Sequence, residues 1–252
     1  MSENVIKTSE KLIFKYLPIN VYTLQTIVNN ELHFTSPQDF NDPRDSKFKL
    51  KVSAEIDGVI NFYNSLNLSS EEKAKKISRY YLDNKEFFND IETEFNTRLK
   101  KETGVTCFSE RNDNALMWSH YADKHTGICL MFEWEKHASF FMGYKVQYKN
   151  TIPEVYYSGN GLFETGNIIL TKLAHWSYEQ EVRSVIKLDN GTNHLAAFDP
   201  KALKGIIYGE RASKVDKKTI RKIINMHPGY ENVEFFTQSV NESNGIIIKK
   251  IT

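Results

Sequence analysis

The spacing of apolar residues changes period along the chain, and each change predicts a different element. An apolar and aromatic run from Leu12 to Tyr16 ends just before a proline, which predicts a strand that enters a turn. Apolar residues then recur at helical spacing in VYTLQTIVNN, with Asn20 as the N-cap and Asn29 and Asn30 as the stop. The segment ELHFTS predicts a second strand, and the turn-rich stretch SPQDFNDPRD follows it.

Helical periodicity dominates from about residue 54 to residue 103. Apolar residues recur around Ile60, Ile77 and Phe87, and lysine and glutamate are mixed between them, as on solvated helix faces. We therefore expect about three helices here, forming an insert between two β-rich parts of the chain.

The β pattern returns after Gly104. The predicted strands are VTCFSE, GICLMFE, YKVQY, EVRSVIKL, KGIIYG, VEFF and GIIIKK, and the predicted helices are ALMWSHYA, a segment near 161–174 and another near 216–226. No repeat, low-complexity tract or flexible linker marks a domain boundary. The pattern predicts a single α+β domain over residues 1–252, with the helical insert near 54–103.

Composition narrows the class of protein. Apolar residues make up 40% and charged residues 26% of the chain, as in a folded globular protein, and a net charge of +1 gives no global attraction for nucleic acid or membrane. Cys107 and Cys129 each lie in an apolar run, which predicts buried thiols and no disulfide. No secretory signal or membrane-spanning run is present, so we expect a cytoplasmic protein with no membrane partner.

Two clusters of polar and aromatic residues offer candidate chemistry. In FNDP, Asn41 and Asp42 precede a proline, which predicts either an Asx-Pro turn or a loop that closes a pocket. The stretch from Cys107 to Phe132, which includes two apolar strand segments, holds Ser109, Trp118, His120, Tyr121 and His125. The two histidines are five residues apart, which does not suit a helical metal pair, so we expect no metal. Trp118 and Tyr121 form either the core face of a short helix or a stacking platform for a ring ligand.

A third cluster holds two carboxylates and a guanidinium. At the two-residue period of a strand, Glu179, Glu181 and Arg183 point to one side. The group is either an exposed edge strand with Glu–Arg pairing or a catalytic strand. In the catalytic case, one carboxylate holds a hydroxyl and stabilises a positively charged, sugar-like transition state.

These stretches resemble a widespread bacterial family of unknown function. The resemblance lies in KYLPIN, LHFTSPQDFNDP, VTCFSERNDNALMWSHYADKHTGICLMF, WSYEQEVR and LKGIIYG, and it spans roughly residues 12 to 211. Its FNDP, MWSHYA and W-Y-E-x-E-x-R blocks occur in that order. This resemblance implies no activity.

A fainter resemblance is to ADP-ribosyltransferases, in which a split β core binds NAD and the last motif is E-x-E. It implies a split, mixed or antiparallel core, NAD as a substrate, Glu181 as the catalytic carboxylate and Glu179 as its companion. The residues implied to contact NAD are Lys15, Tyr16, Ser109, Trp118, His120, Tyr121 and Arg183. The chain departs from that family because Ser109 is a lone hydroxyl where a Ser-Thr-Ser triplet is usual, and Lys15 and Tyr16 stand where arginine or histidine is usual.

Three functions follow from these observations. The leading hypothesis is an NAD-dependent ADP-ribosyltransferase-like enzyme that modifies an unidentified protein or nucleic acid, in toxin or phage-defence biology. The second is a non-catalytic domain that senses a nucleotide or a partner. The third is a metal-dependent nuclease that uses Asp42, Glu179 and Glu181. The sequence assigns no oligomeric state.

Overall fold

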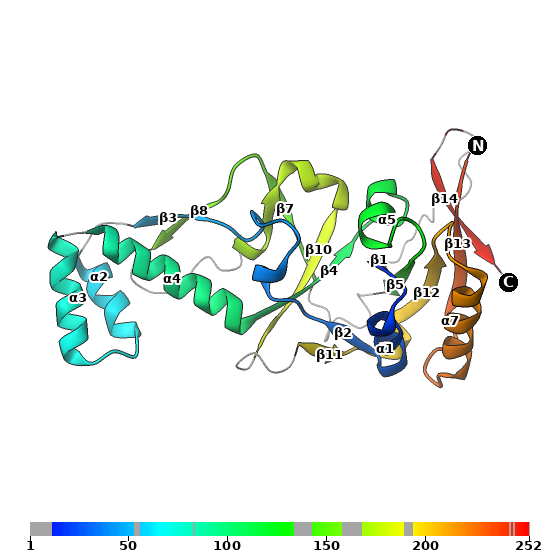
Figure 1. Ribbon diagram of the computed structural model, residues 1–252, viewed down its shortest axis with the longest axis horizontal. Helices are drawn as coiled ribbons and strands as arrows, with labels where there is room; N and C mark the ends of the chain where they lie inside the picture. Colours follow the sequence, from blue (N-terminus) through cyan, green and yellow to red (C-terminus); the bar gives the residue numbers. More distant parts are fainter. Residues whose placement is uncertain are drawn as a thin grey trace.

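The structure is a computed structural model, which describes residues 12–52, 56–82, 84–133, 143–157, 168–188, 194–241, 243 and 245–251. Its centre is an eight-stranded sheet in the order β14-β13-β12-β5-β1-β4-β10-β6 (Figure 1). Its strands are β1 (Leu12–Leu17), β4 (Thr103–Ser109), β5 (Ile128–Glu133), β6 (Gly143–Lys145), β10 (Glu181–Lys187), β12 (Leu203–Tyr208), β13 (Glu234–Val240) and β14 (Ile246–Ile251). Only β12 and β13 pair in parallel among these neighbours, so the sheet is mixed and the predicted α+β class is confirmed.

Three two-stranded ladders and several helices surround this sheet. The ladders pair β2 (Glu31–His33) with β11 (Leu195–Ala197), β3 (Lys49–Val52) with β8 (Glu154–Tyr157), and β7 (Gln147–Lys149) with β9 (Thr171–Leu173). The helices are α1 (Val21–Asn29), α2 (Ile56–Ser65), α3 (Ser70–Leu82), α4 (Asn84–Glu102), α5 (Ala115–Tyr121) and α7 (Lys214–Met226), with 3₁₀ turns η1 (Pro37–Asp39), η3 (Ala174–Glu179) and η4 (Pro200–Ala202).

Local capping explains why α1 begins and ends where the sequence predicts. The Asn20 side chain accepts a hydrogen bond from the Thr23 amide at 3.0 Å, which pairs one of the free amides of the first turn. Asn30 ends the helix in the left-handed region at φ 57°, a conformation that asparagine tolerates better than most residues.

Alternation along the strands divides the core between the two faces of the sheet. Ile13 and Ile206 face the cluster that contains α1 and α7, whereas Phe14 and Ile207 face the cluster that contains α5. Neighbouring residues point to opposite faces because the side-chain period of a strand is two. Both faces are therefore covered around β1 and β12.

The three predicted helices of the insert are present as α2, α3 and α4, and they form an arm at one end of the molecule (Figure 1). Their side chains build a separate apolar cluster around Phe62, Phe87 and Ile91. The helix predicted near 161–174 ends earlier than expected. Residues 161–167 lie outside the described ranges, residues 168 and 169 are helical, and Thr171–Leu173 is a strand because it pairs with Gln147–Lys149.

The central sheet opens between β1 and β4. β1 pairs with β5 from Leu12↔Glu133 to Leu17↔Ile128, and β4 pairs with β10 from Ser109↔Glu181 to Thr103↔Lys187. Within the described strands, β1 and β4 share only the pair Phe14↔Ser109. Beyond that pair the two strands diverge, which leaves space for side chains between them.

The part of the chain that the structure describes contains no helix that is long and apolar enough to cross a membrane.

Gly209 provides a test of the packing between β12 and the loop after α5. A Cβ there would lie 2.1 Å from the carbonyl oxygen of His125, a backbone atom that cannot rotate away. We expect Gly209→Ala to lower the free energy of unfolding by about 1 to 3 kcal/mol, as overpacking usually does, in urea denaturation. The control is Gly245→Ala, whose Cβ would first meet the Asn241 side chain at 3.1 Å. Equal losses in both variants would contradict this account.

Candidate functional site

A cleft of about 240 Å³ lies where β1 and β4 diverge. Residues 14–16 of β1 and 105–108 of β4 line its two sides. The loop from Asp39 to Asp45 adds to the lining. The other lining residues are His33, Thr35, Met117, Tyr121, Lys172, Glu179, Glu181 and Arg183. The open seam in the sheet therefore brings buried charged side chains to the wall of a cleft.

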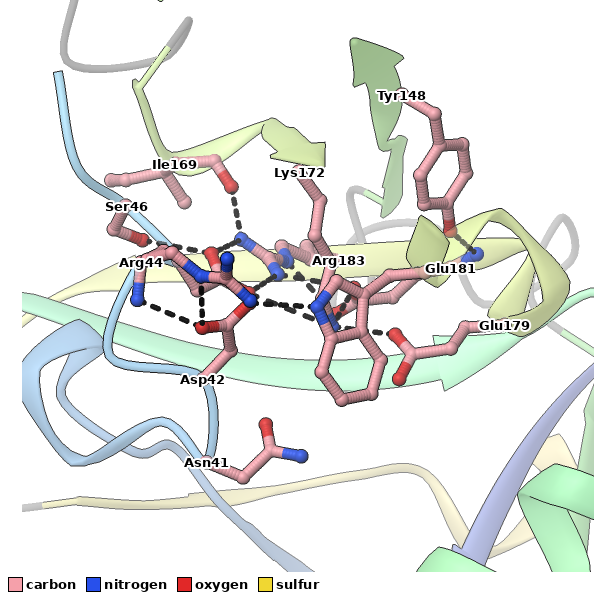
Figure 2. A network of polar contacts seen from close by, with 12 residues as sticks. Asn41, Asp42, Arg44, Ser46, Tyr148, Ile169, Lys172, Glu179, Glu181 and Arg183 are labelled. Atoms are coloured by element: carbon pink, nitrogen blue, oxygen red, sulfur yellow. Dashed lines mark hydrogen bonds and ion pairs between the residues drawn. The ribbon is translucent and has the colours of Figure 1, made fainter. Parts of the chain in front are cut away.

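Arg183 on β10 is the centre of the charged network (Figure 2). Its Nε and Nη2 donate to Glu181 at 2.8 and 3.0 Å, and its Nη1 and Nη2 donate to Asp45 at 3.0 and 2.6 Å. Nη1 also donates to the Ile169 carbonyl, and the guanidinium lies 5.0 Å from the centre of the Phe40 ring. The side chain is 1% exposed, so these partners replace its hydration.

Lys172 on β9 is the second buried cation. Its Nζ lies 2.5 Å from Glu179, 3.3 Å from Glu181 and 3.6 Å from Asp45. The ammonium therefore sits among three carboxylates, where a divalent cation would lie in a metal site. Among the described residues, no group of histidine, cysteine, aspartate and glutamate is arranged to hold a metal ion.

Glu179 connects this network to α5 and to the loop before β3. The Tyr121 hydroxyl donates to Glu179 Oε1 at 2.6 Å, and Asn41 Nδ2 donates to the Tyr121 hydroxyl at 3.0 Å. Ser109 Oγ donates to the Glu179 backbone carbonyl at 2.6 Å. The carboxylate is thus fixed from three separate parts of the chain.

The backbone at Glu179 differs from the sequence prediction. Glu179 ends η3, Gln180 adopts a left-handed conformation at φ 41°, and the strand begins only at Glu181. The expectation that Glu179, Glu181 and Arg183 share one strand face is therefore wrong for Glu179. Its carboxylate reaches the network because the turn at Gln180 redirects the chain, and Lys172 draws the two glutamates together.

The exposed-edge alternative for this segment is also wrong. β10 has β4 on one side and β6 on the other, so it is not an edge strand. Glu181 is 5% exposed and Arg183 1% exposed. The Glu181–Arg183 ion pair is buried, so its contribution to the stability of the fold depends on its geometry far more than that of a surface pair does.

The paired charges shift the acidities of the two glutamates in opposite directions. Burial raises the pKa of Glu181, but the charges of Arg183 and Lys172 outweigh burial and lower that pKa to about 2. Burial raises the pKa of Glu179, and although Lys172 opposes it, the neighbouring Glu181 carboxylate adds to the rise. Lys172 itself is desolvated, yet Glu181 and Glu179 raise its pKa. Glu181 is thus firmly ionised, and Glu179 is the carboxylate that holds its charge least firmly.

Lys15 and Tyr16 lie on the β1 side of the cleft. Lys15 Nζ donates to Thr106 Oγ1 at 2.8 Å and to the Cys107 carbonyl at 3.1 Å, so it bridges the seam to β4. Burial lowers the pKa of Lys15. Tyr16 lines the cleft while its hydroxyl donates to the Arg111 carbonyl at 2.8 Å.

Three predicted contact residues lie away from the cleft surface. Trp118 is fully buried, its Nε1 donates to the Asn112 carbonyl at 2.8 Å, and its ring contacts Tyr16 edge-on at 5.1 Å. This is the core-face alternative, and it leaves no face of the ring open to a ligand. Ser109 is also fully buried and holds the Glu179 backbone. His120 is exposed on α5, with Nδ1 3.2 Å from the Tyr178 hydroxyl, and is not part of the cleft lining.

The FNDP loop combines both of its predicted roles. Asp42 accepts hydrogen bonds from the Arg44 amide at 2.9 Å and from Trp176 Nε1 at 2.7 Å, so it forms an Asx turn that is tied to η3. Asn41 lines the cleft. The cysteines are both free, with Cys129 buried as predicted and Cys107 half-buried in the cleft wall.

Sequence reasoning missed Asp45 and Lys172 as site residues. Lys172 interrupts an otherwise apolar run, IILTKLAHW, and a lone charge in such a run signals a buried partner. Asp45 carries no comparable signal, because it is one of several acidic residues in a turn-rich loop.

Residues 117–184 match the family described as Protein of unknown function (DUF2971). The predicted resemblance to a family of unknown function is thereby confirmed, and the matched segment contains Tyr121, Lys172, Glu179, Glu181 and Arg183. No curated protein and no solved structure matches the chain.

Arg183 allows a direct test of the network's contribution to stability. Arg183→Met leaves Asp45 and Glu181 buried without their main partner, so we expect a loss of about 3 to 5 kcal/mol in the free energy of unfolding. The control is Arg111→Met, which removes an exposed pair with Asp113 and should cost less than about 1 kcal/mol. A small loss at Arg183 would show that the network is not closed as described.

Glu181 predicts a pH dependence of stability. Its folded pKa of about 2 lies below the ordinary value of 4.5, so ionised Glu181 stabilises the fold above pH 4.5 and this stabilisation is lost as the pH falls toward 2. The shift corresponds to about 3 kcal/mol. Denaturation of the wild type and Glu181→Gln between pH 6 and pH 2.5 should show the difference between them shrinking as the pH falls. A constant difference would contradict the assignment.

Proposed function

We propose that the cleft binds NAD and that the protein transfers ADP-ribose to a protein or nucleic acid. The observation that supports this best is the position of Glu179. Its carboxylate is buried, held by Tyr121 and Lys172, and lines a cleft that opens where the central sheet splits. A role in toxin or phage-defence biology belongs to the same proposal.

The lining residues suit one end of a dinucleotide. A cavity of about 240 Å³ is just below the roughly 300 to 1,000 Å³ usual for small-molecule sites, so it accommodates the nicotinamide and its ribose better than the whole molecule. Tyr121 offers a half-buried ring beside the buried Tyr16, and Lys15 offers a cation for a phosphate oxygen. The adenosine part of NAD would then lie along the surface outside the cleft.

The reaction needs a carboxylate near the ribose. The bond between ribose C1′ and the nicotinamide nitrogen breaks, and its electron pair leaves with nicotinamide, which becomes neutral. The positive charge that develops at C1′ and the ring oxygen is stabilised by a buried carboxylate, and a nucleophile on the target then bonds to C1′ and loses its proton. A carboxylate in a low-dielectric site is worth several kcal/mol in such a step.

We assign the contact with the ribose to Glu179 and a positioning role to Glu181. Both Glu181 oxygens accept from Arg183, and one also lies near Lys172, so this carboxylate is committed to the network. Glu179 is linked instead through Tyr121 to Asn41, which lines the cleft. This assignment exchanges the roles that the resemblance implies for the two residues.

A second candidate is a domain that senses a nucleotide without turning it over. The observation that favours it is the position of Lys172, which pairs with Glu179 at 2.5 Å and so weakens the field that the carboxylate presents to the ribose. The metal-dependent nuclease has less support, because the same ammonium lies among the carboxylates that a metal would need.

NAD consumption and transfer of labelled ADP-ribose to whole-cell protein and nucleic acid distinguish these functions. We expect Glu179→Gln, which keeps shape but removes charge, to lower turnover by about a hundredfold or more. Tyr121→Phe should lower it by roughly tenfold, because one charged hydrogen bond is lost. The control is Glu110→Gln, a surface residue paired with Lys145, which should turn over NAD like the wild type.

The outcomes separate the candidates. NAD binding without turnover in the wild type would favour the sensing domain. No NAD binding at all would refute both the transferase hypothesis and the hypothesis that the domain senses NAD. Full activity in Glu179→Gln with loss in Glu181→Gln, at equal stability, would restore the role of Glu181 that the resemblance implies.

A further inference from the structure

The positive charge of the chain is concentrated at its C-terminal end. Residues 201–252 contain ten lysines and arginines against five aspartates and glutamates, although the whole chain has a net charge of only +1. The preceding 200 residues are therefore net acidic. Charge asymmetry of this kind is typical of a segment that contacts a polyanion.

Within this segment, α7 carries the largest share of the basic residues. Its sequence, KVDKKTIRKIINM, places basic residues at Lys214, Lys217, Lys218, Arg221 and Lys222. These positions follow the i, i+3, i+4, i+7, i+8 spacing, so they form one continuous stripe on the helix. The stripe is about 12 Å long at the 1.5 Å rise of a helix, and duplex DNA carries about seven phosphate charges over that length.

The remainder of α7 holds this stripe toward solvent. Ile220 and Ile224 are buried against the sheet, which fixes the rotation of the helix. The one acidic residue of the helix, Asp216, is engaged by Ser213 at the N-cap, where the Ser213 hydroxyl donates to its carboxylate at 2.6 Å. No acidic side chain of α7 itself therefore interrupts the stripe.

Aromatic rings support two of the basic side chains. Arg221 lies 4.3 Å from the centre of the Phe235 ring, and Lys217 lies 5.8 Å from that of Tyr208. These contacts place the charged ends of both half-buried side chains over aromatic rings and so restrict their motion. Lys214, Lys218 and Lys222 are exposed. A preordered row of cations loses less side-chain entropy when it binds a regular array of anions.

We propose that the basic stripe of α7 binds the phosphate backbone of a nucleic-acid duplex. This binding stands independently of NAD turnover, because it uses a surface that shares no residue with the lining of the cleft. If the proposed transferase activity is also present, the stripe points to nucleic acid as the target.

The structure favours a nucleic acid over the other polyanionic surfaces. A membrane-bound amphipathic helix buries its apolar face in lipid, but Ile220 and Ile224 of α7 are already buried in the protein. The exposed apolar residues of α7, Val215 and Met226, lie at opposite ends of the helix and make no continuous face. A second copy of the chain has a net charge of +1, so it presents no net negative charge to the stripe.

Fluorescence anisotropy with a labelled 20-base-pair DNA duplex and an RNA duplex of equal length, without NAD, tests the proposal. We expect the triple variant Lys214→Gln, Lys218→Gln, Lys222→Gln to bind at least tenfold more weakly than the wild type. The slope of log K against log salt should fall in magnitude by about 2 to 3, since each lost phosphate contact removes about 0.9. The control is Lys73→Gln, Lys75→Gln, Lys101→Gln, which removes the same charge from the helical arm.

Three results would overturn the inference. Equal loss in both triple variants would show a response to net charge alone. Binding to vesicles with anionic lipid, but to neither duplex, would identify a membrane surface instead. Sedimentation that shows dimers of the wild type at low salt, lost in the α7 variant while duplex binding is absent, would identify a second copy as the occupant. Because every lysine changed is exposed except the half-buried Lys73, circular dichroism of both variants should match the wild type, and hydrogen-exchange protection of α7 by the duplex would locate the contact directly.

Discussion

The buried pairing of Arg183 with Asp45 and Glu181 is the interaction on which the site depends. Taking a guanidinium out of water is costly unless its donors all find acceptors, and here two carboxylates and the Ile169 carbonyl provide them. The partners come from the loop before β3, from β10 and from the segment before β9. The Arg183 side chain therefore links β10 to two segments that do not pair with β10 in the sheet.

The same network places a buried carboxylate, Glu179, at the cleft. Lys172 and Arg183 are two cations that face three carboxylates, Asp45, Glu179 and Glu181. Lys15 also lines the cleft, so the buried cations and carboxylates there are matched in number, and burial is the main cause of the raised pKa of Glu179. A buried carboxylate at a cleft is the kind of group that the proposed cleavage of a nicotinamide glycosidic bond would need, because that step develops positive charge.

Local signals predicted the elements of this fold better than the assembly of the site. The caps at Asn20 and Asn30, the three helices of the insert and the strand of Arg183 all follow from residues close in sequence. The two-residue period of a strand placed Glu179 wrongly, because Gln180 has a left-handed backbone conformation and separates Glu179 from the strand. Asp45 and Arg183 are 138 residues apart, and no periodicity encodes a contact of that range. The sequence thus indicated which residue types lie at the cleft, but it did not predict which of them form ion pairs with one another.

The order of strands keeps the two proposed surfaces apart. α7 packs with the part of the sheet that contains β12 and β13, whereas the charged network lies at β10, with β5, β1 and β4 between them (Figure 1). Each intervening strand adds nearly 5 Å, so the cations on α7 lie farther from the charged network than the screening length of about 8 to 10 Å. The charges of that network are also almost balanced. Binding of a polyanion and chemistry at a buried carboxylate impose opposite demands on local charge. The strand order keeps the two proposed sites apart, so neither proposal requires a compromise in the local charge of the other.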